Sequence, residues 1–314
     1  MEILFITSGS IGDAIISTSL IAYLCDTYPQ AKFTIAAGRA SAPLFAEFPR
    51  LKSLIPIVKR KYHKHWWNLW QATRKTDWDI VVDLRGSLIS YMLSAKQRKV
   101  FERPDKNKSK YHQLADLFGL AQPYPTRLWA SEATRKKAAD LLPDGKEIIV
   151  IAPKTNSAAK DWAIENFAKL MQNMANFPHP LPEGEGSLER VFVILAAKEQ
   201  KQSVASLLGA LPQGQVIDLS GQTDLLTAFA IIEKAQLFIG NDSGLLHIAA
   251  ASGTKCVGIY GPSNDKVYAP KTPNVKIVKS YDFAMGEPEK RDNIYMQKIS
   301  VEEVEAAAKE MLNS

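Results

Sequence analysis

The sequence contains few cysteines and no long hydrophobic run. Cys25 and Cys256 are the two cysteines among 314 residues, and both stand in apolar stretches. We therefore expect reduced core thiols, with no disulfide, no metal site and no redox chemistry. No run approaches the roughly 18 apolar residues of a membrane span. An acid, Glu2, stands where a signal peptide would carry Lys or Arg. These absences predict a soluble, cytoplasmic protein.

The composition is that of a globular chain, but its charge is unevenly distributed. Hydrophobic residues make up 46% and charged residues 23%, and the length is typical of two domains. Residues 1–150 hold 23 Lys and Arg against 14 Asp and Glu, a net of +9, whereas residues 151–314 hold 16 against 19, a net of −3. The first half therefore suits an anionic partner, such as phosphate or a lipid surface. We expect no nucleic-acid partner, because no RNA-binding motif or basic helix-turn-helix is visible.

Short β-branched runs alternate with amphipathic stretches, which predicts βαβ units around buried parallel sheets. The expected strands are 3–8, 32–37, 54–58, 79–84, 147–153, 190–197, 215–219, 236–240 and 255–260. The expected helices are 13–27, 87–95, 164–175, 199–209, 224–235, 245–251 and 301–312. Pro, Asp and Gly cluster near 142–146, so we place the domains at 1–145 and 146–314. The terminal helix 301–312 could pack back on the first domain, and the Pro- and Gly-rich segment 177–187 is expected to be an exposed, mobile loop without chemistry.

A glycine-rich turn follows the first strand and contains Gly9, Ser10, Gly12 and Asp13. Such a turn exposes backbone N–H groups at a helix N-terminus, which favours anions. A tight βα turn with Asp13 as a first-turn acid explains the same residues. Dinucleotide binding is less favoured, because the glycine spacing is wrong and no acid ends the second strand. At the edge of a sheet, the Asp13 carboxylate could also accept a proton.

Two further polar turns follow strands in the second half. Residues 155–160 offer hydroxyl, amide and lysine groups suited to a diphosphate, although a solvated loop is the commoner meaning of such a segment. Residues 240–251, Gly-Asn-Asp-Ser-Gly-Leu-Leu-His-Ile-Ala-Ala-Ala, place Asp242 and Ser243 at the start of a helix. Free N–H groups there favour a phosphate. Helix capping by Asp242 and a buried, satisfied His247 remain the alternatives.

Basic and aromatic residues alternate along residues 59–70 of the first half. Lys and Arg suit lipid phosphates and Trp suits the interfacial layer, so this stretch could contact an anionic membrane surface. An ordinary amphipathic helix, with Trp66 and Trp70 on its buried side, is the alternative. His63 and His65 have no acid or cysteine at metal-ligand spacing, and no metal site is expected.

With these motifs in view, the sequence resembles glycosyltransferase family 9, the ADP-heptose:lipopolysaccharide heptosyltransferases. The specific signature is Asn-Asp-Ser-Gly-x-x-His-x-Ala-Ala-Ala at 241–251, followed by Gly-x-Tyr-Gly-Pro at 258–262. The similarity also includes 9–13, Asp-Leu-Arg-Gly at 83–86, 110–119, 153–162 and 219–223. It implies a GT-B fold, in which two Rossmann-like, doubly wound parallel-sheet α/β domains face across a cleft. The acceptor would bind the first domain and the nucleotide-sugar donor the second.

The resemblance also implies roles for individual residues. Asp13 would be the general base and Lys160 would neutralise diphosphate charge, a role that a divalent ion plays in other transferases. The implied donor-binding residues are Thr155, Asn156, Lys160, Glu199, Thr223, Asp242, Ser243, Gly244, Leu245 and His247. The implied acceptor-side residues are Gly9, Ser10, Gly12 and Arg85. Asn156 departs from the hydroxyl residue that many relatives carry, and in the segment Ala196-Ala197-Lys198 ahead of Glu199 an Ala stands where Gly is usual.

The function implied by the resemblance is inverting, metal-independent transfer of a heptose from ADP-heptose to a lipopolysaccharide inner-core acceptor. No cofactor is expected. The partners would be the nucleotide sugar, an anionic glycolipid and, peripherally, the cytoplasmic face of the inner membrane. Two alternatives remain open: a transferase of another sugar or nucleotide carrier, and a non-catalytic nucleotide-binding relative.

Overall fold

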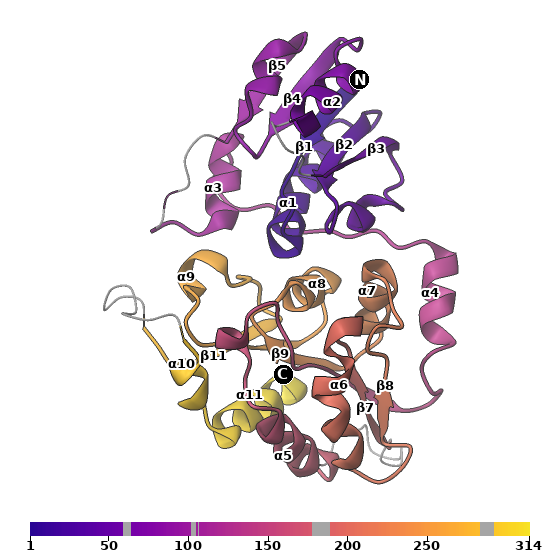
Figure 1. Ribbon diagram of the computed structural model, residues 1–314, viewed down its shortest axis with the longest axis vertical. Coiled ribbons are helices and arrows are strands. Elements are labelled where there is room, and N and C mark those ends of the chain that lie inside the picture. The colour runs from indigo at the N-terminus through magenta and orange to yellow at the C-terminus, as the bar shows by residue number, and fades with distance from the viewer. Residues whose placement is uncertain (59–63, 102–104, 106, 178–188, 283–291) are drawn as a thin grey trace. The chain divides into compact units, whose positions relative to one another are not determined.

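The computed structural model describes residues 1–58, 64–101, 105, 107–177, 189–282 and 292–314. By their internal contacts these residues form two compact units, Met1–Ser131 and Glu132–Ser314. Each unit is a parallel β-sheet covered by helices (Figure 1). The expectation of two doubly wound α/β units is therefore confirmed.

The sheet of the first unit has the strand order β3-β2-β1-β4-β5, and all its neighbours are parallel. The strands are β1 (Glu2–Ile6), β2 (Lys32–Gly38), β3 (Leu51–Ile57), β4 (Trp78–Asp83) and β5 (Ala95–Val100). Residues of β1, β2 and β4 are almost entirely buried, because helices cover both faces of the sheet. The order of the strands reverses between β1 and β4. Open α/β sheets bind ligands beyond the carboxyl ends of the strands at such a point.

Two pairs of elements cover this sheet: α1 (Ile11–Thr27) contacts α3 (Lys110–Leu117), and α2 (Lys64–Thr73) contacts the 3-10 helix η3 (Leu88–Met92). Another 3-10 helix, η1 (Ala42–Phe45), follows β2. The expected helix 87–95 is wrong. The segment forms only the short η3, and β5 begins at Ala95. β5 is an edge strand without a buried side chain, and Lys96, Arg98 and Lys99 interrupt any apolar pattern.

The sheet of the second unit has the order β11-β10-β9-β6-β7-β8, again with parallel neighbours. The strands are β6 (Glu147–Ala152), β7 (Arg190–Ile194), β8 (Val216–Asp218), β9 (Leu237–Asn241), β10 (Cys256–Tyr260) and β11 (Val275–Lys279). The strand order reverses between β6 and β9. The loops that leave these two strands therefore flank the binding position of this sheet.

Helices cover both faces of the second sheet. They are α4 (Glu132–Ala139), α5 (Ile164–Ala175), α6 (Lys201–Val204), α7 (Leu225–Glu233), α8 (Gly244–Ser252), α9 (Asp265–Tyr268), α10 (Ile294–Gln297) and α11 (Val301–Asn313). The expected helix 199–209 is broken into η5 (Lys198–Gln200), α6 and η6 (Ala205–Gly209). α5 and α11 share one core cluster with the sheet, and α7 contacts α8. The apolar side of α11 is buried within this unit, and its packing on the first unit stays a prediction.

The boundary between the units precedes α4, whereas the sequence suggested residues 145–146. α4 contacts α7 of the second unit, and the Arg135 guanidinium donates hydrogen bonds of 2.9 and 3.1 Å to Glu233. The charge asymmetry is unaffected. Residues 1–131 hold 19 Lys and Arg against 10 Asp and Glu, a net of +9, and residues 132–314 hold 20 against 23, a net of −3. The expected mobile loop lies outside the described residues from position 178 onward.

Candidate active site

In the second unit, the loops after β6 and β9 are fastened together at the point where the strand order reverses. Gly240 pairs with Ala152, and a Cβ at Gly240 would lie 2.8 Å from the Ala152 carbonyl oxygen. The fully buried Asn241 donates from its amide to the Pro153 carbonyl oxygen at 2.7 Å. Its amide oxygen accepts from the backbone N–H of Trp162 at 3.3 Å. One asparagine, to which the sequence analysis assigned no role, thus holds both loops in register.

Lys160 and Asp242 form an ion pair across these loops. The Lys160 Nζ lies 2.6 Å from Asp242 Oδ2, and the side chains are 37% and 9% exposed. Burial acts to raise the pKa of the Asp242 carboxyl, but the charge and hydrogen bond of Lys160, together with smaller effects of Ser263 and His247, leave that pKa below its usual value. Asp242 is therefore an ionised, nearly buried carboxylate with its cationic partner beside it.

Helix α8 begins at Gly244, two residues after Asp242, and its N-terminus presents unsatisfied polar groups. Ser243 is the N-cap residue, yet its side chain makes no capping hydrogen bond. Its hydroxyl oxygen is buried and has no hydrogen-bond partner among the described residues. The first N–H groups of a helix also lack intrahelical partners, and they carry the positive end of the helix dipole. His247 lies one turn further and is nearly buried. This helix end is therefore suited to an anion.

The loop after β6 is shaped by its own hydrogen bonds. The Thr155 hydroxyl donates to the Ser157 carbonyl oxygen at 2.8 Å and accepts from the Ser157 N–H at 3.0 Å. Asp161 accepts from the Thr155 N–H at 2.8 Å and pairs with Lys154 at 2.6 Å. Asn156 is exposed. Thr155 thus has a structural task in addition to any ligand contact.

The next loops along this edge follow β7 and β8. Glu199 is exposed on η5, and the neighbouring Gln200 donates from its amide to the Thr155 carbonyl oxygen at 2.7 Å. The turn after β8 packs tightly, because Gly221 has a φ of +70° and a Cβ there would lie 2.7 Å from the Lys198 Cα. Thr223 is half-buried just beyond that turn. Lys160, Asp242, Glu199 and Thr223 thus lie on loops at one edge of one sheet. Gln200, which the sequence analysis missed, links two of these loops.

In the first unit, the turn between β1 and α1 approaches the end of β2 closely. A Cβ at Gly38 would lie 2.3 Å from the Gly9 Cα, so this backbone contact requires a glycine at position 38. Gly9 and Ser10 are exposed and Gly12 is half-buried. The Ser10 N–H donates to the Ser8 hydroxyl oxygen at 3.1 Å, and that hydroxyl donates to Asp13 Oδ2 at 3.4 Å. A chain of hydrogen bonds within the turn therefore ends at the Asp13 carboxylate.

Asp13 pairs with Lys110 from α3. The Nζ–Oδ1 distance is 2.5 Å, and the side chains of Lys110 and Asp13 are 26% and 31% exposed. Asp13 stands in the first turn of α1, where the helix dipole favours a carboxylate. Lys110 lay within the family resemblance but received no role in the sequence analysis. The signal that could have indicated it is its place in the motif 110–119.

Arg85, expected on the acceptor side, lies after β4 and stacks on α2. Its guanidinium is 5.2 Å from the centre of the Trp66 ring, and its backbone N–H donates to Asp83 at 2.9 Å. The buried Asp83 also accepts two hydrogen bonds from Ser87, which fixes the path of the chain after the strand. Arg85 and Asp13 thus belong to the adjacent strand ends β4 and β1 but contact different helices.

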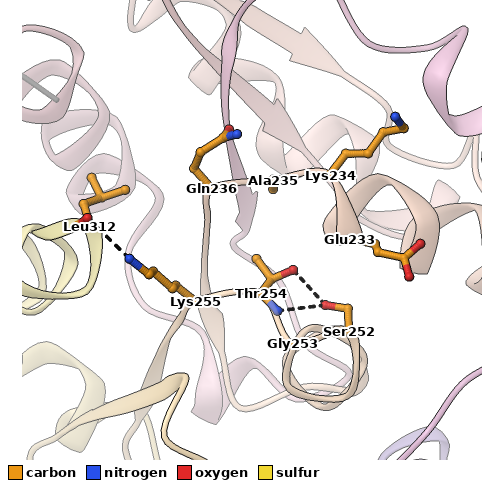
Figure 2. A pocket seen from close by; sticks show the side chains of 9 residues that line it. All are labelled: Glu233, Lys234, Ala235, Gln236, Ser252, Gly253, Thr254, Lys255 and Leu312. Carbon is orange, nitrogen blue, oxygen red and sulfur yellow. Dashed lines mark hydrogen bonds between the residues drawn. The ribbon is translucent and has the colours of Figure 1, made fainter. Parts of the chain in front are cut away.

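A hollow lined mainly by polar residues occupies the opposite edge of the second sheet. It contains Gln236 and Lys255, which precede β9 and β10, and the Lys255 Nζ lies 3.5 Å from the Leu312 carbonyl oxygen (Figure 2). Because the loops of Lys160 and Asp242 leave the carboxyl ends of the strands, this hollow is separate from them. Within the described ranges, no group of three or more His, Cys, Asp or Glu residues could hold a metal ion. Nor is any described helix long and apolar enough to cross a membrane.

Comparison with known proteins decides the family. The family model of glycosyltransferase family 9 (heptosyltransferase) matches residues 108–298, which is more than half of the chain. This chain belongs to glycosyltransferase family 9. The matched region of this glycosyltransferase includes Lys110 and the loops of Lys160 and Asp242. The lipopolysaccharide core heptosyltransferase OpsX of Haemophilus influenzae is 24% identical to it over 297 residues, covering 87% of this chain and 82% of the relative.

Solved structures support the fold assigned to this family-9 chain. The ADP-heptose lipopolysaccharide heptosyltransferase II of Escherichia coli superimposes with a TM-score of 0.78 at 21% identity, covering 100% of this chain and 99% of that one. The E. coli heptosyltransferase WaaC, solved with ADP, has a TM-score of 0.72 at 16% identity, covering 99% and 100%. The expected family and the GT-B fold are confirmed. The roles assigned to individual residues stay predictions.

Proposed function

We propose that this glycosyltransferase moves a heptose from ADP-heptose to an acceptor in the inner core of lipopolysaccharide. The observation that carries the proposal is the pairing of Lys160 with the nearly buried Asp242 at the open N-terminus of α8. A lysine beside free helix N–H groups is suited to two phosphates. The names of the relatives support a heptose donor, and a solved neighbour of similar fold holds ADP.

The donor would bind to the second unit. In this proposal, Ser243, Gly244 and Leu245 bind the diphosphate through backbone N–H groups and the unpartnered serine hydroxyl. Asp242 binds hydroxyls of the sugar. The remaining donor-binding residues are Thr155, Asn156, Glu199, Thr223 and His247, of which Glu199 and Thr223 are assigned to the nucleoside.

The acceptor would bind to the first unit, along the turn that contains Gly9, Ser10 and Gly12 and near Arg85. Asp13 acts as the general base. The acceptor hydroxyl oxygen forms a bond to the anomeric carbon of the heptose as the bond from that carbon to the diphosphate oxygen breaks. The proton passes from the hydroxyl to Asp13, and the electron pair of the broken bond leaves with ADP. A single displacement of this kind inverts the anomeric configuration.

Lys160 would stabilise the negative charge that develops on the departing diphosphate, so that no divalent ion is required. Preorganised charge at the position where charge develops is typically the largest contribution to catalysis. Asp242 supports this role, because it holds the ammonium group of Lys160 at the start of α8 before the donor arrives.

The proposal is tested by incubating the protein with ADP-heptose and lipopolysaccharide truncated in its inner core, with a chelator present. Mass spectrometry should show the addition of one heptose, and NMR should show the anomeric configuration opposite to that of the donor. If transfer is lost in the presence of the chelator and recovers when a divalent ion is added, then the ion and not Lys160 alone stabilises the departing diphosphate, and the role proposed for Lys160 is wrong. A retained anomeric configuration would remove the single displacement.

Calorimetry with ADP, UDP and GDP tests the nucleotide separately. We expect ADP to bind most tightly. A clear preference for UDP or GDP would leave a family-9 transferase with another donor. Tight ADP binding without transfer to any inner-core acceptor would indicate a nucleotide-binding relative without catalysis.

A further inference from the structure

The first unit exposes an apolar surface that the proposed reaction does not use. Four large hydrophobic side chains of α2 and η3 face solvent: Trp67 is 54% exposed, Leu88 79%, Tyr91 57% and Met92 56%. The other exposed large hydrophobic residues of the described chain lie on five separate segments, at Met1, Val58, Leu208, Tyr268 and Ile294. Single apolar side chains on a surface are ordinary, whereas a cluster indicates a contact.

Direct contacts join α2 and η3 into one face, which we call the α2–η3 face. The rings of Trp67 and Trp70 lie 4.7 Å apart, and the Trp70 indole N–H donates to the Met92 carbonyl oxygen at 3.4 Å. Beneath this face, Leu69 and Ile89 are buried in the core of the unit. The exposed residues therefore stand on anchored elements, and their exposure is not the result of a poorly packed segment.

The same face is positively charged. The Arg74 guanidinium lies 4.8 Å from the centre of the Trp70 ring, and Arg85 covers the Trp66 ring. Lys64 and Lys75 are exposed at the two ends of α2. Neither α2 nor η3 contains an acidic residue. Indole rings flanked by Lys and Arg are the combination that settles at the headgroup level of a bilayer.

We propose that the α2–η3 face docks on an anionic phospholipid surface. The proposal extends the proposed function, since a glycolipid acceptor would lie in such a surface, but it does not depend on the identity of the donor. It also goes beyond the basic stretch seen in the sequence. The apolar part of the face comes largely from η3, and residues 59–63 of that stretch lie outside the described chain. Charge complementarity selects the occupant, because α2 and η3 contain no carboxylate and the cations Lys64, Arg74, Lys75 and Arg85 outnumber the exposed Asp77 that follows Lys75.

Vesicle sedimentation tests the proposal with the full chain. We expect binding to vesicles of phosphatidylcholine mixed with phosphatidylglycerol, weaker binding as salt is added, and little binding to phosphatidylcholine alone. Replacing Arg74 and Lys75 together by Gln should lower the partition coefficient about 30-fold, since each cation near an anionic surface contributes about fivefold. Trp67→Ser with Leu88→Ser and Tyr91→Ser should lower it at least about tenfold through lost apolar burial.

The matched control is Leu208→Ser with Ile294→Ser, which removes two comparably exposed apolar side chains from the second unit. This control should bind vesicles as the unchanged protein does. Equal binding to neutral and anionic vesicles would overturn the proposal. So would absence of binding by the folded protein, as expected if the face meets another protein, or an equal loss in the control.

The same variants separate this proposal from the proposed function. Binding of ADP by calorimetry and transfer to a delipidated, soluble acceptor should be unchanged, while transfer to acceptor embedded in anionic vesicles should fall with the partition coefficient. If neither the unchanged protein nor any variant transfers heptose, the vesicle-binding measurements alone still test whether the α2–η3 face docks on the lipid surface.

Discussion

The two units share one plan and differ in how they hold charge at the strand ends. In both, the strand order reverses at the first strand, β1 or β6, and a glycine-dependent close approach lies beside it. In the first unit, Asp13 and Lys110 are both about one-third exposed or less. In the second, Asp242 is nearly buried, and the hydroxyl of Ser243 beside it has no hydrogen-bond partner in the part of the chain that the structure describes. The two edges therefore differ in their carboxylates: Asp13 is accessible to solvent, whereas Asp242 is nearly buried and holds Lys160 in place.

This difference corresponds to a division of chemical work. An accessible carboxylate can exchange a proton with an incoming hydroxyl and with water. A buried carboxylate that fixes a lysine at a helix N-terminus instead allows that lysine to bind an anion without reorganisation. The net charge is +9 on the first unit and −3 on the second, so anion binding in the second unit depends on the local lysine and helix N-terminus and not on net charge. The substitutions below test whether the division holds.

Asp13→Asn should have the largest effect. The amide keeps the size of the side chain but cannot accept the proton, so the transfer rate should fall about 10²- to 10⁴-fold. Binding of ADP by calorimetry should be unchanged, because the donor belongs to the other unit. Asp26→Asn is the matched control, since Asp26 is a carboxylate on the same helix paired with Arg127. Full activity in Asp13→Asn would remove the proposed base.

Lys160→Met should lower the rate about 10²- to 10³-fold, because a preorganised charge at the leaving group is lost. It should also destabilise the second unit by about 2 kcal/mol, because the nearly buried Asp242 carboxylate loses its partner. Lys169→Met, which breaks an exposed pair with Glu302, is the control and should do neither. If both variants retain full activity, the proposed charge stabilisation is wrong.

The stability loss in Lys160→Met should depend on pH. In the unchanged protein the pKa of Asp242 is lowered on folding, so its contribution is present above the unfolded value of about 3.9 and is lost as the pH falls through the lower folded value. Without Lys160 the largest remaining effect is that of burial, which raises the pKa of Asp242 against the smaller lowering effects of Ser263 and His247. The difference between the two proteins, measured by hydrogen exchange of the second unit, should be largest at pH 7 and should shrink toward about pH 4. A constant difference would mean that Asp242 is not its source.

Much of this fold could be predicted, because buried strands and amphipathic helices leave periodic signals. The helix 164–175 is found at its expected bounds, and the central strands lie within a few residues of theirs. β5 and β11 were missed, since basic residues interrupt both of these edge strands and leave no continuous apolar run. The short helices α3 and α4 were missed as well. Each has only eight residues, too few for a clear period, and α4 buries only Ala138.

The candidate residues were found more readily than their partners. Motifs identified Asp13, Lys160 and Asp242, because glycines and polar residues that follow a predicted strand can be recognised from the sequence alone. The pairing of Lys110 with Asp13 joins residues 97 positions apart, and nothing local in the sequence encodes that contact. Asn241 and Gln200 were overlooked for a related reason: each forms hydrogen bonds that join loops following different strands, and these bonds are not visible in the local sequence. Such contacts follow from strand order, which the sequence pattern did not specify.

Gly240→Ala tests whether the second edge depends on close packing. The added methyl would meet the carbonyl oxygen and the Cβ of Ala152 at 2.8 and 2.9 Å. Overpacking of this kind should cost about 1–3 kcal/mol of stability. Hydrogen exchange of β6 and β9 should report the loss. Gly209→Ala is the control, because a Cβ there meets nothing within 4 Å and the change should be neutral or slightly stabilising. An equal change in stability in the two variants would show that the packing between β6 and β9 can adjust to an added methyl group.

Lys110→Met should have the smallest effect and is the sharpest test of the comparison between the edges. Because Lys110 and Asp13 are partly exposed, loss of the pair should change stability by less than about 1 kcal/mol, unlike the loss of Lys160. The rate should still fall about tenfold, since the carboxylate is no longer held in one position. Lys110→Arg should recover part of it. Lys108→Met, which breaks the exposed pair with Asp116, is the control. A stability loss as large as that of Lys160→Met would show that both edges are preorganised alike, and the division of work between them would not hold.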